Sequence, residues 1–397
     1  MLLGGLRYLL PVIEAAHRQG YRVVTCDYVP DNIAHKYSDE FHNVSVIDKE
    51  AVLALAKKLD IDGIMSFAVD PGVETASYVA EKLGLSFQGD YEAVRILQNK
   101  DLFRRFLAEH GFNTPEAVGY ETLEEASASK EALHYPVIVK PVDSAGSKGV
   151  SRVDSSDDFD RTARLAFSQS HGGRIIVEEF LEKEGHSSDT ECFTIDGRLV
   201  FCSFSDQRFD DRADNPYTPA AYSWPATMPE TAQKELRDEL QRLVTLLGLR
   251  TGIYNVETRL CTNGKPYIME VSPRGGGNRL AEMLRHACGT DLIDAAVSNA
   301  MGGECREMSD PVYDGFLAEI VLHADKNGRF VRLDIADEMK KHLVETDLWV
   351  KEGDAVEGFK GANNAIGTLV LRFDTRDELE NAMADIPGWC KVIIGDR

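Results

Sequence analysis

Apolar and polar positions alternate in blocks over residues 1–95 and divide them into short strands and helices. Apolar runs predict strands at residues 2–3, 21–26, 44–46 and 63–67, and apolar side chains at helical spacing predict helices at 49–59 and 72–83. Strands that alternate with helices of this length indicate βαβ units around a parallel sheet. The opening strand is so short that we expect residues of it to be missing upstream, and no charged segment of the signal-peptide kind precedes it. The first turn, GGLRYL, lacks the GxGxxG pattern, so we expect no dinucleotide site in this unit.

A second unit begins near residue 96 with an amphipathic helix that ends before Gly111 and Pro115. An apolar strand at residues 137–139 leads into the loop DSAGSKGV, and a further strand is expected at 174–181. The polar stretch EKEGHSSDTECF follows, and Asp196-Gly197 favours a hairpin turn.

Residues 206–229 have no apolar periodicity and are rich in Pro, Asp and Arg. A loop of this length inside a compact domain is uncommon unless it is a lid or a binding loop, and we expect one here. A long amphipathic helix at residues 230–247 follows, and one or two helices are expected at 280–300. From about residue 311 the pattern predicts a small β-rich domain with a final helix after Thr375 and strands at 316–323, 330–333, 343–350 and 365–373.

Residues 252–279 form a predicted β-hairpin. Asn263-Gly264 favours a two-residue turn, which sets Glu257 opposite Glu270. One face then carries Asn255, Glu257, Arg259, Glu270 and Ser272, and the other is a core face with Tyr254, Val256, Leu260, Tyr267, Met269 and Val271. Facing carboxylates repel unless they are neutralised, and Mg²⁺ commonly binds one or two carboxylates together with substrate phosphates. The alternative is that one carboxylate is solvated or pairs with Arg259 or Arg274.

Basic and small residues elsewhere offer contacts for an anion. Lys100 begins a helix, where a cation is unfavourable unless it faces an anion. Lys140 leaves an apolar strand beside a loop with two glycines and two serines, whose backbone N–H groups can surround phosphate oxygens. Arg274 precedes three glycines, which allow close approach to the backbone. Taken one at a time, each of these side chains could equally be solvated.

Composition limits the classes of partner. The net charge is −22 and no basic stripe is present, which argues against nucleic acid and anionic membranes. No apolar run approaches the roughly 18 residues of a transmembrane helix. The seven cysteines are scattered without a CxxC pair, so we expect reduced thiols and a cytoplasmic protein.

Taken in order, these motifs resemble the ATP-grasp superfamily. The set consists of Lys100 before GFNTP, Lys140 in YPVIVKP before DSAGSKGV, then VEEFL, and Glu257 and Glu270 with SPRGGGN. The stretches YSWPATMP, EGDAVEGF and AIGTLVL are similar to those of ATP-grasp amino-acid and dipeptide ligases and of phosphoribosylglycinamide-synthetase-like proteins. The resemblance implies an α/β and α+β multidomain fold: a parallel-sheet pre-ATP-grasp domain at 1–95, a lid lobe at 96–178, a C lobe with the metal hairpin at 179–310, and a β-rich C-terminal domain at 311–397.

The resemblance also implies roles for individual residues. The nucleotide phosphates would be contacted by Lys100, Lys140 and the loop with Ser144, Gly146, Ser147 and Gly149; Glu178, Glu179 and Leu181 would line the adenine site, and Glu184, or Glu182 in its place, would bind the ribose. Glu257, Glu270 and Ser272 would bind Mg²⁺, or Mn²⁺ in its place, and Arg274 would stabilise an acyl phosphate. The family commonly has Asn at the position of Ser272, so metal geometry or occupancy should differ here. Arg208, Arg212 and Arg279 are candidates for binding the substrate carboxylate.

The reaction that this resemblance implies is an ADP-forming ligation. A carboxylate attacks the γ-phosphate of ATP to give an acyl phosphate, and an amine then displaces phosphate to give an amide. Small-molecule carboxylate and amine substrates are the expected partners, and a homodimer is the suggested assembly. Two alternatives stay open: an ATP-grasp enzyme that acts on formate or bicarbonate, and a nucleotide-binding regulator without turnover, for which Ser272 is the suspicious feature.

Overall fold

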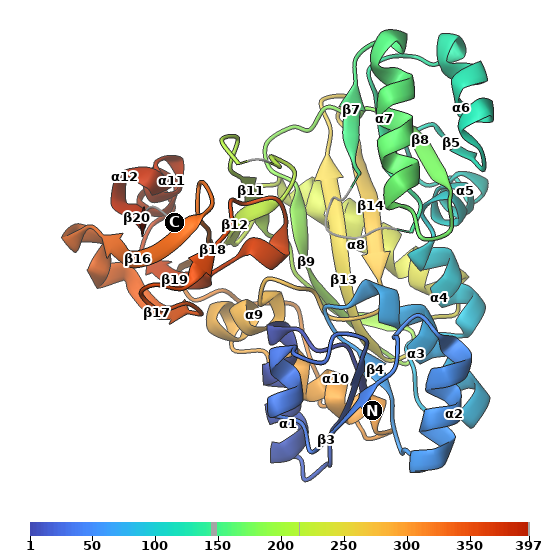
Figure 1. The fold of residues 1–397 in the computed structure, drawn as a ribbon, viewed down its shortest axis with the longest axis horizontal. Coiled ribbons are helices and arrows are strands. Elements are labelled where there is room, and N and C mark those ends of the chain that lie inside the picture. Colours follow the sequence, from blue (N-terminus) through green and yellow to red (C-terminus); the bar gives the residue numbers. More distant parts are fainter. Residues whose placement is uncertain (144–148, 214, 396–397) are drawn as a thin grey trace.

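The computed structural model describes residues 1–143, 149–213 and 215–395, and the strands of these residues form five sheets (Figure 1). The N-terminal sheet is parallel, as predicted, with strand order β3-β2-β1-β4. Its elements are β1 (Leu2–Leu3), α1 (Leu10–Arg18), β2 (Val24–Asp27), β3 (Glu40–Asn43), α2 (Lys49–Leu59), β4 (Met65–Ser66) and α3 (Asp70–Leu83). The predicted position of β3, at 44–46, is wrong because residues 40–43 pair with β2, while Val46 packs into the core.

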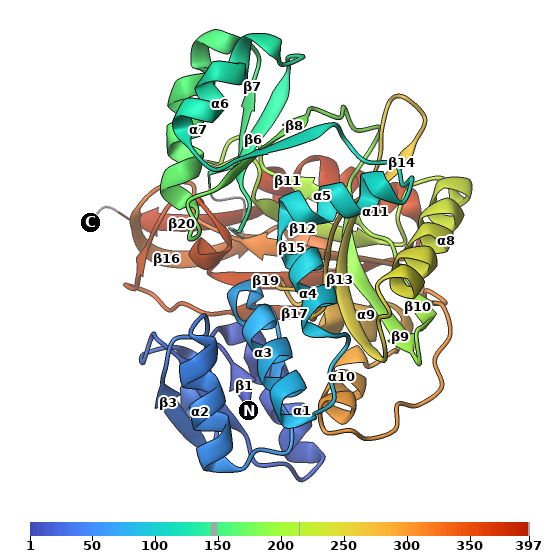
Figure 2. The ribbon, with the colours of Figure 1, turned by 90° about the vertical axis from the view of Figure 1, so that its right-hand side faces the viewer.

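The next unit is a small antiparallel sheet, β5-β8-β6-β7, that lies at one end of the molecule (Figure 2). Its elements are α4 (Tyr91–Gln98), α5 (Lys100–Glu109), β5 (Ala117–Tyr120), α6 (Leu123–Ser129), β6 (Val137–Pro141), β7 (Ser151–Val153), α7 (Ser156–Gln169) and β8 (Ile175–Glu179). Val137, Val139 and Val177 alternate along the strands and form one core with Phe159 of α7. The other face of the sheet therefore presents the intervening side chains, Lys140 and Glu178 among them. We call this sheet with its helices the lid.

The central sheet, β10-β9-β13-β14, carries the predicted hairpin. It consists of β9 (Ser188–Ile195), β10 (Arg198–Cys202), β13 (Gly252–Leu260) and β14 (Pro266–Ser272). The helices α8 (Glu230–Leu246), α9 (Leu280–Cys288) and α10 (Leu292–Ala300) pack against this sheet. Leu236, Leu240 and Leu243 of α8 form one core with Tyr254 and Val256. That packing leaves the opposite face of β13 and β14 to polar side chains.

The last unit contains a five-stranded sheet, β11-β12-β15-β19-β17, and a three-stranded sheet, β18-β16-β20. Its elements are β11 (Asp206–Phe209), β12 (Pro219–Trp224), β15 (Phe316–Leu322), β16 (Gly328–Ile335), β17 (Leu343–Leu348), β18 (Ala355–Val356), β19 (Gly367–Phe373), α11 (Arg376–Ala384), α12 (Ile386–Trp389) and β20 (Cys390–Gly395). No helix in the described ranges is long and apolar enough to span a bilayer.

The prediction of a long loop at residues 206–229 is wrong. β11 and β12 pair with each other, and β12 pairs with β15 more than ninety residues later in the chain. Tyr222 and Trp224 are completely buried, so the segment is held by tertiary packing that its Pro- and Asp-rich sequence does not reveal. This sheet spans the boundary expected at residue 311, and the domain boundaries stay predictions.

Candidate active site

The two hairpin glutamates face each other, although the turn that joins their strands differs from the prediction. Register pairs Glu257 with Glu270 and Asn255 with Ser272. The N–H of Cys261 donates to Lys265 O at 3.0 Å, so the loop has three residues rather than two. That difference shifts the pairing by one, and a bulge at Met269, between Ile268 and Glu270, shifts it back. Two irregularities that cancel therefore produce the predicted pair.

The bulge changes which side chains reach the core under α8. Ile268 joins that core, whereas Tyr267 packs in a separate cluster with Leu181 and Cys261, against which Met269 lies. The prediction that Tyr267 and Met269 belong to the core face is wrong because the extra residue inverts the alternation beyond it. Tyr267 pairs with Arg259 and so lies on the same face as the glutamates.

Six polar positions form two rows across this face. One row contains Asp189 of β9, Glu257 and Glu270, and the next contains Glu191, Asn255 and Ser272. Residues directly opposite on paired strands point to the same side of a sheet. The sequence prediction missed Asp189 and Glu191. Counting backward from the Asp196-Gly197 turn would have placed both of them on one face of β9.

Glu257 and Glu270 can hold a divalent cation. The Glu257 side chain is 34% exposed and its carboxylate lies 3.7 Å from Arg259; the Glu270 side chain is 41% exposed and lies 3.7 Å from Lys100. Neither carboxylate is therefore closed off by a short ion pair. Burial, with the charge of Glu270, raises the pKa of Glu257 even though Arg259 opposes the rise. Among the described residues no group of three or more acidic, His or Cys side chains is arranged to hold a metal ion.

Asp189 and Glu191 carry raised pKa values. Burial, followed by the charge of Glu257, raises the pKa of Asp189 to about 7. Burial raises the pKa of Glu191 to about 8. Asp189 Oδ1 accepts from Asn255 Nδ2 at 2.8 Å, and Glu191 Oε1 accepts from the Gly276 N–H at 2.6 Å. The floor of the site therefore contains more carboxyl groups than the two that the sequence predicts as metal ligands.

On the lid side the charges are paired. Lys140 Nζ lies 2.7 Å from Glu178 Oε2, and Arg104 Nε donates to Glu178 Oε1 at 2.9 Å. Burial alone would raise the pKa of Glu178, but Arg104 and Lys140 outweigh it and hold the pKa at about 2. Burial lowers the pKa of Lys140, and Glu178 opposes that change. Glu178, which is predicted to line the adenine site, thus forms an ion pair that holds Lys140 in place.

The predicted adenine and ribose residues lie at the junction between the lid and the hairpin. Leu181 packs with Tyr267 in the small apolar cluster. The Glu184 N–H donates to Leu260 O at 2.8 Å, and Glu182 O accepts from Thr262. The Glu179 side chain accepts from the Glu116 N–H and so turns to the outside of the lid. The adenine and ribose roles of these residues, Leu181 included, stay predictions.

Arg274 and Ser272 share one partner in the N-terminal unit. Asp70, the first residue of α3, accepts two Arg274 N–H groups at 2.6 Å and 2.9 Å through Oδ1 and one at 2.7 Å through Oδ2. Ser272 Oγ donates to Asp70 Oδ1 at 2.9 Å and accepts from Gln98 Nε2 at 2.9 Å. The serine hydroxyl is thus oriented by this network, while Asn255 turns to Asp189. Asp70 could not be identified from the sequence because it precedes Arg274 by about two hundred residues.

The glycines after Arg274 allow the loop to pack against the N-terminal unit. A Cβ on Gly275 would stand 2.2 Å from the ring of Phe67, and one on Gly276 would stand 2.8 Å from Asn255 Nδ2. The Ala68 N–H donates to Gly275 O at 2.9 Å. Larger residues would separate Arg274 from Asp70.

In the predicted phosphate loop, Gly149 has φ +71°, and a Cβ there would meet Gln169 at 3.0 Å, so glycine is required. Ser144, Gly146 and Ser147 lie outside the described residues. The three arginines proposed for the substrate are not brought together: Arg208 pairs with Glu380 at 2.9 Å, Arg212 is 60% exposed beside Asp210, and Arg279 pairs with Glu345 at 2.7 Å. Their substrate role stays a prediction.

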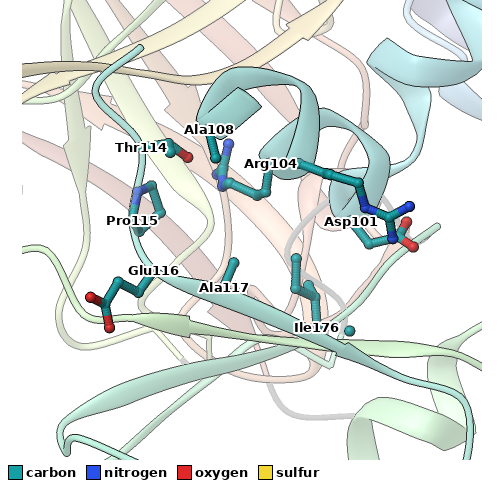
Figure 3. Close-up of a pocket in the computed structure, with 10 residues that line it drawn as sticks. Asp101, Arg104, Ala108, Thr114, Pro115, Glu116, Ala117 and Ile176 are labelled. Atoms are coloured by element: carbon teal, nitrogen blue, oxygen red, sulfur yellow. The ribbon is translucent and has the colours of Figure 1, made fainter. Parts of the chain in front are cut away.

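A cavity of about 350 Å³ lies beside α5 (Figure 3). Asp101 and Arg104 line it from the helix, and Ala117 and Ile176 line it from the lid strands. It is a separate space from the polar rows of the hairpin, but Arg104 connects the two through Glu178.

Comparisons with known proteins agree with the site. The model of the family described as ATP-grasp domain matches residues 133–282, and this chain therefore contains an ATP-grasp domain, as its motifs predict. The formate-dependent phosphoribosylglycinamide formyltransferase of Methanocaldococcus jannaschii is 27% identical over 301 residues, which cover 72% of this chain and 74% of that protein.

Solved structures show the same fold over the whole chain. The L-amino acid ligase from Bacillus licheniformis has a TM-score of 0.80 at 22% identity and covers 100% of this chain and 98% of its own. The biotin carboxylase domain dimer of the Hydrogenobacter thermophilus 2-oxoglutarate carboxylase, in complex with MgADP and bicarbonate, has a TM-score of 0.74 at 15% identity and covers 99% and 90%. These likenesses confirm the predicted α/β and α+β fold class, and ATP-dependent ligases of the predicted class are among the proteins that this chain resembles. ATP-grasp enzymes in general use ATP and Mg²⁺.

Proposed function

We propose that this protein is an ATP- and Mg²⁺-dependent ligase that activates a carboxylate as an acyl phosphate and joins it to an amine, releasing ADP and phosphate. The observation that carries the proposal is the facing pair Glu257 and Glu270, open to a ligand and set below Lys100 in a chain with an ATP-grasp domain. Phosphoryl transfer of this kind needs mainly positioning and charge neutralisation. No nucleophilic side chain is required.

The roles of the residues follow from what each of them contacts. Glu257 and Glu270 would hold Mg²⁺, which when bound neutralises charge on the phosphates. Lys140, fixed by Glu178, presents a point charge to the nucleotide phosphates from the lid, and Lys100 presents a second from the start of α5. Asp70 and Gly275 engage Arg274 and leave it at least one of its five N–H groups for the acyl phosphate.

The experiment is ADP release with Mg²⁺ and ATP across a panel of amino acids and other carboxylates, with hydroxylamine present to trap acyl phosphate. Formate and bicarbonate belong in the panel because a curated relative of this chain is formate-dependent by name. We expect a hydroxamate from one acid of the panel. ATP binding without release on any acid would contradict the ligase proposal and favour a regulator without turnover.

A further inference from the structure

The cavity beside α5 is enclosed by that helix and by strands of the lid. Its volume is about 350 Å³, and Pro115, Ala117 and Ile176 give it apolar walls (Figure 3). Asp101 and Arg104 of α5 line it as well. Of the described residues that line this cavity, none has an assigned contact with ATP or Mg²⁺, so its occupant is a separate question.

Three buried polar atoms of the cavity-lining residues have no hydrogen-bond partner within the described chain. They are Asp101 Oδ1, Arg104 Nη1 and Thr114 Oγ1. Asp101 is 6% exposed and Arg104 is 4% exposed. Buried polar atoms in folded proteins are almost always satisfied, and the exceptions often mark the place of a ligand or of water. Three such atoms around one cavity therefore indicate a polar occupant.

The charges of these side chains are already compensated. Arg104 Nε donates to Glu178 at 2.9 Å, and Arg174 donates to Asp101 Oδ2. A ligand with a net charge would add an uncompensated charge to buried surroundings, which is unfavourable. The unpartnered atoms require instead a neutral group that accepts a hydrogen bond from Arg104 and donates one to Asp101, while the Thr114 hydroxyl can do either. A carboxamide has both functions, in its carbonyl oxygen and its NH₂ group.

The cavity is connected to the lysine of the predicted phosphate site. Glu178 accepts from Arg104 through Oε1, and its Oε2 lies 2.7 Å from Lys140 Nζ. A ligand that bonds to Arg104 Nη1 would restrict Arg104 and, through Glu178, Lys140. Two ligands that restrict the same side chains favour each other, because the second to bind loses less conformational entropy.

We propose that this cavity binds a small neutral carboxamide and that its occupation strengthens ATP binding. The proposal goes beyond the ligase function, because it requires ATP binding but no turnover. The apolar walls match a hydrocarbon body next to the amide group, and the unpartnered polar atoms match the amide itself.

The test compares benzamide, benzoate and benzamidinium, which share one shape but are neutral, negative and positive. Saturation-transfer NMR of the full chain, with ADP and Mg²⁺ in excess to fill the nucleotide site, measures their binding. We expect a Kd of about 1 mM for benzamide. The two charged compounds should bind at least roughly five-fold more weakly. Calorimetric titration should show ATP binding roughly five-fold tighter when benzamide is in excess.

Substitutions of the lining locate the bound amide. Ala108→Leu adds a larger side chain at an exposed position of α5 that lines the cavity, where leucine is a good helix former, and it should abolish benzamide binding. Thr114→Val removes the hydroxyl at nearly constant shape and should weaken benzamide binding roughly five-fold. Ala128→Leu is the matched control, because Ala128 is an exposed alanine of α6 outside the cavity lining, and it should bind benzamide as wild type does.

Equal binding of the three compounds, or benzamide binding that Ala108→Leu leaves unchanged, would overturn the proposal. ATP affinity that benzamide leaves unchanged or weakens would also overturn it. Absence of benzamide binding to wild type would do the same and would assign the three polar atoms to water.

Discussion

The lid and the hairpin sheet, which form two walls of the site, differ in how their carboxylates are paired with basic side chains. On the lid, the buried carboxylate Glu178 has two basic partners within 3 Å, Arg104 and Lys140. On the hairpin sheet, Asp189 and Glu257 lie side by side, with Glu270 next in the row, and within the described residues each hairpin glutamate has one basic contact, at 3.7 Å. The buried carboxylate of the lid thus has close basic partners without ligand, whereas among the described residues the hairpin carboxylates have only more distant ones.

The difference indicates which wall of the site depends on a bound ligand to neutralise its charges. A satisfied ion network fixes side chains in place, so Lys140 is held ready before nucleotide arrives. A row of carboxylates without close basic partners instead has affinity for a divalent metal ion. Substitutions in the lid network should therefore mainly lower the free energy of unfolding, and substitutions of the hairpin carboxylates should mainly weaken ligand binding.

The largest effect is expected for Arg104→Met. Glu178 would keep Lys140 as its one basic partner, and breaking a buried ion pair commonly costs about 3–5 kcal/mol, so we expect a loss of about 3 kcal/mol in the free energy of unfolding. Urea denaturation measures it. Arg105→Met, at the exposed neighbouring position, is the control and should change little. Equal stability of the two variants would remove the structural role given to the lid network.

Lys140→Met should weaken ATP binding roughly 10- to 100-fold, because it removes a charge–phosphate contact. Arg104 still holds Glu178, so the variant should fold. Calorimetric titration with ATP and Mg²⁺ measures the affinity. Lys130→Met removes a lysine that pairs with Asp160 on the lid surface and should bind ATP normally. Unchanged affinity in Lys140→Met would refute the phosphate-site assignment.

The two walls should also respond oppositely to pH. The pKa of Glu178, about 2, is below its unfolded value, so its contribution to stability is complete above about pH 5 and is lost as pH falls toward 2. The pKa values of Asp189 and Glu191, about 7 and 8, are above theirs, so the folded state binds more protons and stability without ligand declines as pH rises from about 5 to 8. Glu191→Gln should flatten that decline in urea denaturation. A slope identical to wild type would show that Glu191 does not titrate in this range.

The smallest effect is expected for Ser272→Ala. It removes the hydroxyl that joins Gln98 to Asp70, but Asp70 keeps its bonds to Arg274. A net hydrogen bond contributes about 1 kcal/mol, so turnover should fall by roughly five-fold or less. Steady-state ADP release measures it. A loss comparable to that of a metal-ligand variant would mean that Ser272 contacts the metal directly.

Local patterns predicted the parallel N-terminal sheet, the lid strands β6 and β8, and the hairpin, because each is recorded in periodicity and turn residues within a short window. The strands within residues 206–229 were not predicted because β12 pairs with β15, which lies far along the chain. The bulge at Met269 was not predicted for a different reason. The local pattern is compatible with the strand register with or without the bulge, and the packing of Ile268 under α8 selects the register with it. Of the site, the ordered motifs revealed the basic and acidic side chains that resemble those of a known family, whereas Asp70, Asp189 and Glu191 become visible only when strands and domains are brought together.

The measurement that tests the central claim most directly is Mn²⁺ binding in the presence of ADP, followed by electron paramagnetic resonance, in wild type and in Glu270→Gln. The account predicts tight, nucleotide-dependent Mn²⁺ binding in wild type and a loss of roughly 10-fold or more in the variant, while ADP binding without metal is kept. Mn²⁺ affinity that is equal in the two proteins would contradict the claim that the facing glutamates form the metal site.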